Sequence, residues 1–152
     1  MDDIDKLTAK AFKLLSYRPR SIFEIKTRLK KLTPSSALID KVINQLINQD
    51  LLNDEEFARW WVDQRLSHRP RGNFGLTAEL SQKGIDKKII NQVLLTSAQE
   101  KNLAKKFIHS RQSRLQSLPL QQQKIKVIQW LKTRGFSFKS IYPVIDEFTR
   151  KE

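Results

Sequence analysis

The chain has 152 residues, no cysteine, and 29 lysine and arginine residues against 16 aspartate and glutamate residues, which gives a net charge of +13 at pH 7. The lack of cysteine excludes disulfides and thiolate chemistry, and no apolar run approaches the ~20 residues needed to span a bilayer. With an acidic N-terminus unlike a signal peptide, we expect a cytoplasmic protein with no membrane contact. A basic balance favours nucleic acid or an acidic partner, and the alternative is a surface that is charged only for solubility.

A fixed sequence period predicts the architecture. Leu29, Leu80 and Leu131 are 51 residues apart, and the same interval separates Arg18 from Arg69. A period of this size, placed around turn residues, is typical of a tandem array. We therefore predict an all-α fold of three tandem three-helix repeats, bounded at residues 1–52, 53–97 and 98–152.

The first repeat shows three apolar stripes with helical spacing. The first helix ends near Tyr17, because Pro19 disfavours helical geometry at Arg18. Ser21 and Glu24 have the spacing of a capping box for the second helix. The inward positions predicted for the second and third helices are Ile22, Ile25, Leu29, Leu32, Ile39, Val42, Ile43, Leu46 and Ile47.

The second repeat begins at a predicted cap formed by Asn53 and Glu56. A basic turn over residues 69–73 separates its first two helices, and Gly84 has the left-handed position that ends a helix. The inward positions predicted here are Phe57, Ala58, Trp61, Val62, Leu76, Leu80, Ile89, Ile90, Val93 and Leu94.

The third repeat is predicted to begin with a capping box of Ser97 and Glu100, and residues 116–123 read as a loop. Pro143 fits the first turn of the ninth helix if Ser140 is the cap, whereas a start at Ser137 predicts a kink. The inward positions predicted here are Leu103, Ala104, Phe107, Ile108, Ile125, Ile128, Leu131, Ile141, Val144, Ile145 and Phe148.

No residue pattern indicates catalysis, a metal site or a cofactor. His68 and His109, the only histidines, lack the spacing of a metal site or of a base beside a nucleophile. The glycines of Arg71-Gly72-Asn73-Phe74-Gly75 have no preceding strand, so we interpret them as shaping a turn and not as a nucleotide loop. Among the aromatic residues, Phe12, Phe57, Trp61 and Phe107 are expected in the core, while Trp60, Phe74 and Phe138 could stack on a partner.

The basic residues are the candidate binding groups. Paired Arg-Pro-Arg turns occur at equivalent positions of the first two repeats, and stacked repeats would place such positions along one surface. The alternative is that cations near helix ends only complement the helix dipole. The candidate partner- or DNA-binding residues are Arg18, Arg20, Arg59, Arg65, Arg69, Arg71, Lys83, Lys87, Lys88, Lys132, Arg134 and Lys139.

Several of these motifs together resemble the RecX family of bacterial regulatory proteins. They are Arg18-x-Arg20-Ser21-x-x-Glu24, Asp54-x-x-Phe57-Ala58, Arg71-Gly72 followed by Glu79-Leu80-x-x-Lys83-Gly84-Ile85, and Leu131-x-x-Arg134-Gly135-Phe136. The first repeat departs from the pattern, because Lys31-Leu32-Thr33-Pro34 stands where a Lys-Gly turn is usual.

The resemblance implies an elongated, curved row of helix-turn-helix-like units that is not an enzyme and acts as a monomer in the bacterial cytoplasm. Its implied partner is the RecA nucleoprotein filament, with single- or double-stranded DNA contacted weakly or through that filament. Binding along the filament groove would limit the ATPase, strand-exchange and coprotease activities of RecA. The alternative is a stand-alone helix-turn-helix reader of DNA, with Asn44, Gln45 and Asn48 on the outer face of its recognition helix.

Overall fold

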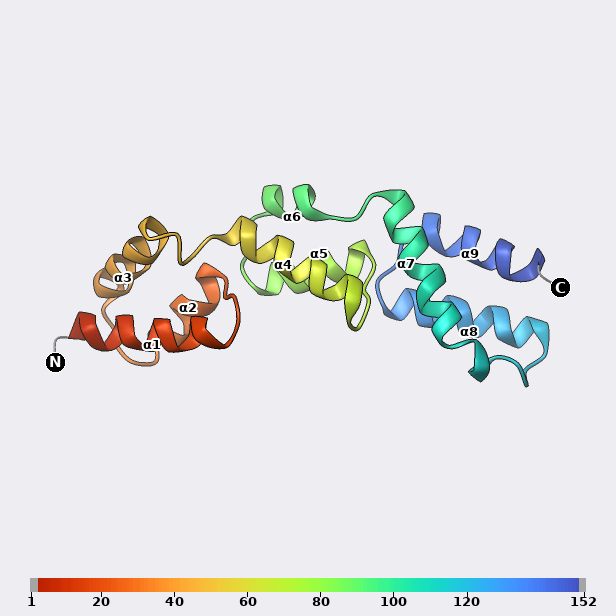
Figure 1. Ribbon diagram of the computed structural model, residues 1–152, viewed down its shortest axis with the longest axis horizontal. Coiled ribbons are helices and arrows are strands. Elements are labelled where there is room, and N and C mark those ends of the chain that lie inside the picture. The colour runs from red at the N-terminus through yellow and green to blue at the C-terminus, as the bar shows by residue number, and fades with distance from the viewer. Residues whose placement is uncertain (1–2, 151–152) are drawn as a thin grey trace. The chain divides into compact units, whose positions relative to one another are not determined.

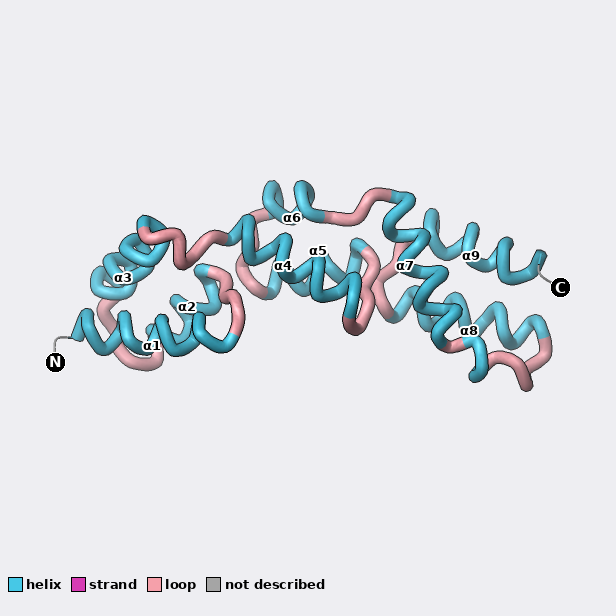
Figure 2. Tube along the Cα trace, in the orientation of Figure 1, coloured by secondary structure: helices cyan, strands magenta, loops and turns pink. Residues whose placement is uncertain are grey.

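The computed structural model describes residues 3–150, with side chains as far as Glu147. Over that range the chain is helical and contains no strand, which confirms the all-α prediction (Figures 1 and 2). The predicted inward position of Phe148 lies outside the described side chains. The helices are α1 (Asp3–Tyr17), α2 (Ile22–Leu29), α3 (Ser36–Asn48), α4 (Asp54–Ser67), α5 (Asn73–Gln82), α6 (Lys87–Val93), α7 (Ser97–Ser110), the 3-10 helix η1 (Gln112–Arg114), α8 (Leu120–Thr133) and α9 (Phe138–Arg150).

The chain forms two compact units. Unit 1 comprises Met1–Trp61 with Leu80–Gln92, and unit 2 comprises Val62–Glu79 with Val93–Glu152. Unit 1 therefore takes the beginning of α4, the end of α5 and α6 up to Gln92, while the rest of the middle segment belongs to unit 2. The repeat boundaries at residues 52 and 97 stay a prediction from the sequence period.

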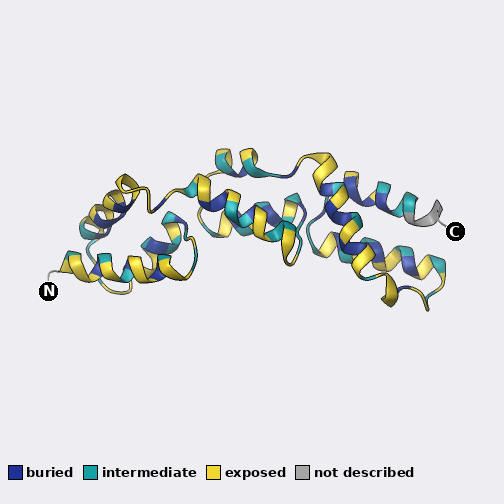
Figure 3. Ribbon diagram, in the orientation of Figure 1, coloured by how far each residue is buried: buried dark blue, intermediate teal, exposed yellow. Residues whose placement is uncertain are grey.

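In unit 1, helices α1, α2 and α3 pack on one another around a shared apolar core (Figure 3). Leu32 and Ile47, predicted to face inward, are instead 56% and 37% exposed. Leu32 lies beyond the end of α2, where helical spacing no longer applies. The buried core residues of this unit are Leu7, Ala11, Leu14, Ile25, Leu29, Ile39, Val42, Ile43, Leu46 and Leu52.

In unit 2, α9 packs against both α7 and α8. Ile125 was predicted to face the core but is 54% exposed, and Val127 is fully buried in its place. The stretch predicted as a loop is only partly so, because α8 begins at Leu120. Buried residues of α7, α8 and α9 include Leu103, Ala104, Phe107, Ile108, Val127, Leu131, Ile141 and Val144.

The helix starts agree with the sequence at two of three predicted caps. Ser21 and Glu24 form the expected capping box, and Asn53 Oδ1 accepts hydrogen bonds from the amides of the first turn of α4. The box predicted for Ser97 and Glu100 is wrong, because Thr96 and Gln99 form it one residue earlier. Glu100 is therefore not part of the cap, and its carboxylate accepts hydrogen bonds from other segments of unit 2.

The ninth helix begins at Phe138, and the amide of Ile141 donates to the carbonyl of Ser137. Pro143 therefore lies inside the helix, and the alternative with Ser140 as the cap is wrong. Ser140 is instead almost fully buried, with its hydroxyl directed to a carboxylate of another helix.

Candidate functional site

Glu24 collects three of the predicted basic residues in unit 1. Arg18 donates two hydrogen bonds to its carboxylate, of 3.2 Å from Nη1 and 2.5 Å from Nη2. Lys83 Nζ lies 3.5 Å away, and Arg20 Nη1 lies 4.0 Å away. Arg20 also donates from Nε to the carbonyl of Leu14. The first Arg-Pro-Arg turn therefore has an internal, structural partner that the sequence did not indicate.

The ionisation of Glu24 depends on two opposing effects, its burial and its pairing with cations and hydrogen-bond donors. Burial opposes ionisation of Glu24, but the hydrogen bonds from Arg18 and the Ser21 amide, with the positive charges of Arg18 and Lys83, outweigh it and lower the pKa of Glu24. Lys83 also lies 5.4 Å from the ring centre of Trp61, within cation–π distance. The single Glu24 carboxylate thereby offsets part of the local positive charge within the unit.

The same cluster sits on a junction between α2 and the turn that follows α5. The buried hydroxyl of Ser21 donates to the carbonyl of Lys83 at 2.7 Å. Gly84, with a φ of +74°, lies against Phe23, whose Cβ would be 2.3 Å from any Cβ added there. The amide of Ile22 donates to Asp54 Oδ1 at 2.9 Å, which ties the start of α2 to the start of α4.

Unit 2 contains an equivalent junction, 51 residues further along the sequence at each position. The amide of Gly72 donates to the carbonyl of Arg134 at 2.9 Å, and the amide of Phe74 donates to that of Gly135 at 3.0 Å. Gly135 has a φ of +78°. The 51-residue sequence period thus corresponds to a contact that occurs in both units, in which the start of a helix packs against a turn that contains glycine.

A second carboxylate, Glu79, holds the next pair of predicted basic residues. Arg65 forms a two-point ion pair with it through Nε and Nη2. Arg71 Nε lies 3.9 Å from the same carboxylate, too far for a hydrogen bond. Arg65 and Arg71 therefore belong to an internal ion-pair network of unit 2.

Glu100 is the most buried acidic side chain among the described residues, at 2% exposure. Its Oε2 accepts from the Asn73 amide at 2.6 Å, and its Oε1 accepts from the hydroxyls of Ser137 and Ser140 at 2.5 and 2.6 Å. Burial opposes its ionisation, yet these hydrogen bonds prevail and lower the pKa of Glu100. One carboxylate on α7 thus joins the starts of α5 and α9.

A hollow in unit 2 is lined by four arginines, together with Pro70, Phe107 and Ser110. Arg69 comes from the turn after α4 and has a φ of +50°, Arg111 caps α7, Arg114 ends η1, and Arg134 caps α8. The guanidinium carbons of Arg111 and Arg134 lie 4.6 and 5.3 Å from the ring centre of Phe107. We call these four residues the arginine pocket.

The arginine pocket contains two residues that the sequence reading missed. Arg69 and Arg134 were predicted as binding residues, whereas Arg111 and Arg114 belong to no motif. A signal existed only in the charge excess of residues 99–152, which carry 12 basic and 4 acidic side chains.

The other predicted basic residues lie apart from these clusters. Arg59, Lys87, Lys88 and Lys139 are exposed, and their role in binding stays a prediction. Lys132 Nζ lies 5.9 Å from the ring centre of Phe138, which stacks on Tyr142. Phe74 and Phe138 are exposed as expected, but Phe12, predicted in the core, is 45% exposed, and Trp60 packs against Phe57.

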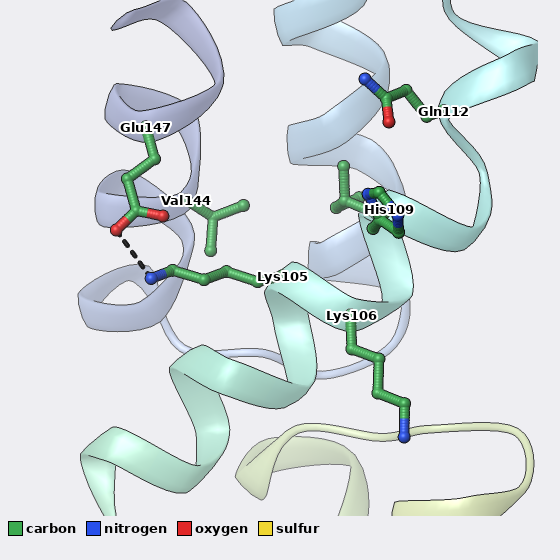
Figure 4. Close-up of a pocket in the computed structure, with 7 residues that line it drawn as sticks. Lys105, Lys106, His109, Gln112, Val144 and Glu147 are labelled. Carbon is green, nitrogen blue, oxygen red and sulfur yellow. Dashed lines mark ion pairs between the residues drawn. The ribbon is translucent and has the colours of Figure 1, made fainter. Parts of the chain in front are cut away.

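A second hollow in unit 2 lies between α7 and α9 (Figure 4). Lys105 pairs with Glu147 across it at 2.7 Å, and His109 and Gln112 line its other side. Within the described residues no group of three or more histidine, cysteine, aspartate or glutamate side chains could hold a metal ion. No helix in the described range is both long and apolar enough to cross a membrane.

Comparison with known protein families gives matches in two segments of the chain. The models of the first and second three-helix domains of RecX match residues 9–46 and 53–94, respectively. A relative from Chlorobium phaeobacteroides named "Regulatory protein RecX" is 31% identical over 145 residues, which cover 92% of this chain and 91% of the relative. Relatives of the same name from Bacillus subtilis and Halalkalibacterium halodurans are 32% and 33% identical over 96% and 67% of this chain.

The lengths of these relatives differ. This chain spans 56% of the Bacillus subtilis relative and 38% of the Halalkalibacterium halodurans relative. Among solved structures, the crystal structure of RecX from Lactobacillus salivarius is similar with a TM-score of 0.86 at 29% identity, over 98% of both chains. A second crystal structure of a regulatory protein RecX has a TM-score of 0.80 at 28% identity, covering 96% of this chain and 72% of that chain.

Proposed function

We propose a regulatory function for this chain from one premise: it belongs to the RecX family. Two family-model matches, relatives named as regulatory proteins and solved RecX structures of the same all-α fold support the premise. The family resemblance expected from the sequence motifs is thereby confirmed.

The proposed activity is modulation of RecA without enzymatic chemistry. The chain binds as a monomer along the groove of the RecA–DNA filament in the bacterial cytoplasm and limits ATP hydrolysis, strand exchange and coprotease activity. It thereby acts on homologous recombination, DNA repair and the SOS response. Several weak contacts along one filament reinforce one another through effective concentration, which suits a chain of small helical units.

The arginine pocket is the structural observation that supports this proposal independently of the family membership. The arginines around Glu24 and Glu79 have a carboxylate partner inside the chain, so their charge is partly neutralised. Arg69, Arg111, Arg114 and Arg134 converge on one hollow without a carboxylate in its lining. Such a surface attracts acidic protein groups and DNA phosphates by long-range steering.

The test is RecA-dependent ATP hydrolysis on single-stranded DNA. The chain at stoichiometric or lower amounts should inhibit hydrolysis and strand exchange. Arg69→Glu should weaken that inhibition, with the largest loss at low salt, because Arg69 is exposed and reversal there leaves the Arg65–Glu79 pair intact. Lys126→Glu, an exposed change of equal charge on α8, is the control. Unchanged hydrolysis and strand exchange with the wild-type chain would contradict the proposal.

A second candidate function rests on α3. Asn44, Gln45 and Asn48 are exposed on this helix, while its opposite face is buried in the core of unit 1. Asparagine and glutamine read adenine edges in the major groove, so α3 has the side chains of a recognition helix. Tight sequence-specific binding to duplex DNA without RecA would favour this alternative.

A further inference from the structure

The arginine pocket concentrates positive charge that the described part of unit 2 does not neutralise. Its four guanidinium groups come from four separate places: the turn after α4, the end of α7, η1 and the end of α8. Pro70, Phe107 and Ser110 complete the lining. None of the residues described as lining it is acidic, and no ion pair within the described range involves these four arginines.

Electrostatics within the fold disfavour this arrangement. Partial burial lowers the pKa of Arg134, and the nearby charges of Arg71, Arg111, Arg65 and Arg69 lower it further. Helix C-termini carry partial negative charge, which helps to explain Arg111 and Arg134 individually as caps of α7 and α8. The partial negative charge of about one half at each helix end does not offset four full positive charges. Binding of an anion would therefore lower the electrostatic free energy of the cluster.

Two of the four guanidinium groups, those of Arg111 and Arg134, lie against aromatic rings. The guanidinium carbon of Arg111 lies 4.6 Å from the ring centre of Phe107 and 5.7 Å from that of Trp130. The carbonyl of Arg134 accepts a hydrogen bond from the Gly72 amide, which holds the backbone of this residue at the repeat junction. Arginines that are already ordered lose less conformational entropy when they bind.

We propose that the arginine pocket, formed by Arg69, Arg111, Arg114 and Arg134, binds a phosphate group. The planar guanidinium fork matches phosphate oxygens with two parallel hydrogen bonds, and several such forks around one hollow suit a tetrahedral anion. The group comes either from a nucleic-acid backbone or from a free nucleotide. The first source deepens the proposed function and rests on it, because the filament contains single-stranded DNA.

The test uses the full chain and Arg69→Asn combined with Arg114→Gln. Both side chains are exposed, and asparagine tolerates the positive φ of residue 69, so this double variant should fold as the wild type does. The control is Lys31→Gln with Lys126→Gln, which removes the same two charges from exposed positions outside the pocket. Thermal unfolding followed by circular dichroism checks that all three proteins are equally folded.

The first measurement is the fluorescence anisotropy of labelled oligothymidylate, without RecA, across a salt series. The pocket variant should bind about tenfold more weakly at low salt, the loss expected for about 1.4 kcal/mol. Its slope of log affinity against log salt should fall by about 1.4, because each phosphate contact on a single strand contributes about 0.7. The control variant should lose about threefold or less. Equal losses in the two double variants would overturn the proposal.

The second measurement assigns the source, using calorimetric titration with ADP and with inorganic phosphate. Binding of either ligand by the wild type and not by the pocket variant shows that a free phosphate compound suffices. Oligothymidylate binding that depends on the pocket, without ADP or phosphate binding, assigns the backbone as the source. Binding of none of the three probes overturns the proposal. RecA is absent throughout, so this result is independent of the ATP-hydrolysis test of the proposed function.

Discussion

Replacing Glu100 by alanine is expected to lower the free energy of unfolding by about 3 kcal/mol, with the loss confined to unit 2. The substitution leaves the Asn73 amide and the hydroxyls of Ser137 and Ser140 without their acceptor in a buried site. Each buried donor left unpaired costs about 1–3 kcal/mol, and partial rearrangement or entry of water reduces the sum. Urea unfolding with a tryptophan signal in unit 2, from Trp130, measures the change.

Asp63→Ala is the matched control, because Asp63 is exposed on α4 and a surface change of this kind stays within about 0.5 kcal/mol. Glu100 also predicts a pH dependence of the free energy of unfolding. The pKa of Glu100 is lowered in the folded state, so its contribution is present above its usual value of 4.5 and is lost as pH falls through the folded-state pKa. Glu100→Ala should flatten this acid-side decline. An equally steep decline in wild type and variant would contradict the role assigned to Glu100.

Gly135→Ala is expected to cost about 3–5 kcal/mol and to open the junction in unit 2. An added Cβ would lie 2.2 Å from the Gly75 amide nitrogen and 2.5 Å from its Cα, and these are backbone atoms that a rotamer change cannot move. The positive φ of residue 135 adds about 1–2 kcal/mol for any side chain. The hydrogen bonds from Phe74 and Gly75 to the Gly135 carbonyl would also be lost. Urea unfolding gives the size of the effect.

Gly75→Ala provides the graded comparison for this junction. Its Cβ would lie 2.9 Å from the Arg134 carbonyl oxygen, and Gly75 is helical with no positive φ. It should therefore be destabilising, but less so than Gly135→Ala. Hydrogen exchange of the Gly72 and Phe74 amides, which donate across the junction, locates the damage. Unchanged protection of these two amides in Gly135→Ala would show that the junction is not where the energy is lost.

The sequence predicted the helical class and the glycine turn at Gly84 for clear physical reasons. Apolar spacing and turn residues are local signals, and Gly84 and Gly135 are glycines because their backbones adopt positive φ. The 51-residue period is explained by the two junctions, in which a helix start docks onto a glycine turn in the same way. The acceptor carbonyls of Lys83 and Arg134 occupy equivalent positions, with the Ser21 hydroxyl as the donor in one junction and the Gly72 amide in the other.

The same local reasoning failed where a side chain has distant partners. Glu100 sits near a helix start, where a favourable interaction with the helix dipole explains an acidic residue, and its partners are 27, 37 and 40 residues away. Arg111 and Arg114 meet Arg69 and Arg134 only through the packing of unit 2. The spacing of residues along one segment does not show which side chains from distant segments come together in the folded unit.

The helical spacing of apolar residues also did not predict which residues at the edge of a buried helix face are covered. Phe12 and Ile125 have the spacing of core residues, yet within the described part of the chain they are 45% and 54% exposed. Val127, fully buried on α8, was passed over. The period identifies a helix face only to within about one residue, and the neighbouring helix decides which edge is covered.

We propose that this chain recognises the RecA–DNA filament in preference to DNA alone. The direct test is co-sedimentation of the chain with RecA-coated single-stranded DNA and, in parallel, anisotropy with the same DNA uncoated, both at about 0.15 M salt. We expect binding to the filament at least about tenfold tighter than to bare DNA, weakened by Arg69→Glu and not by Lys126→Glu. Equal affinity for filament and bare DNA, or no binding to the filament, would contradict it.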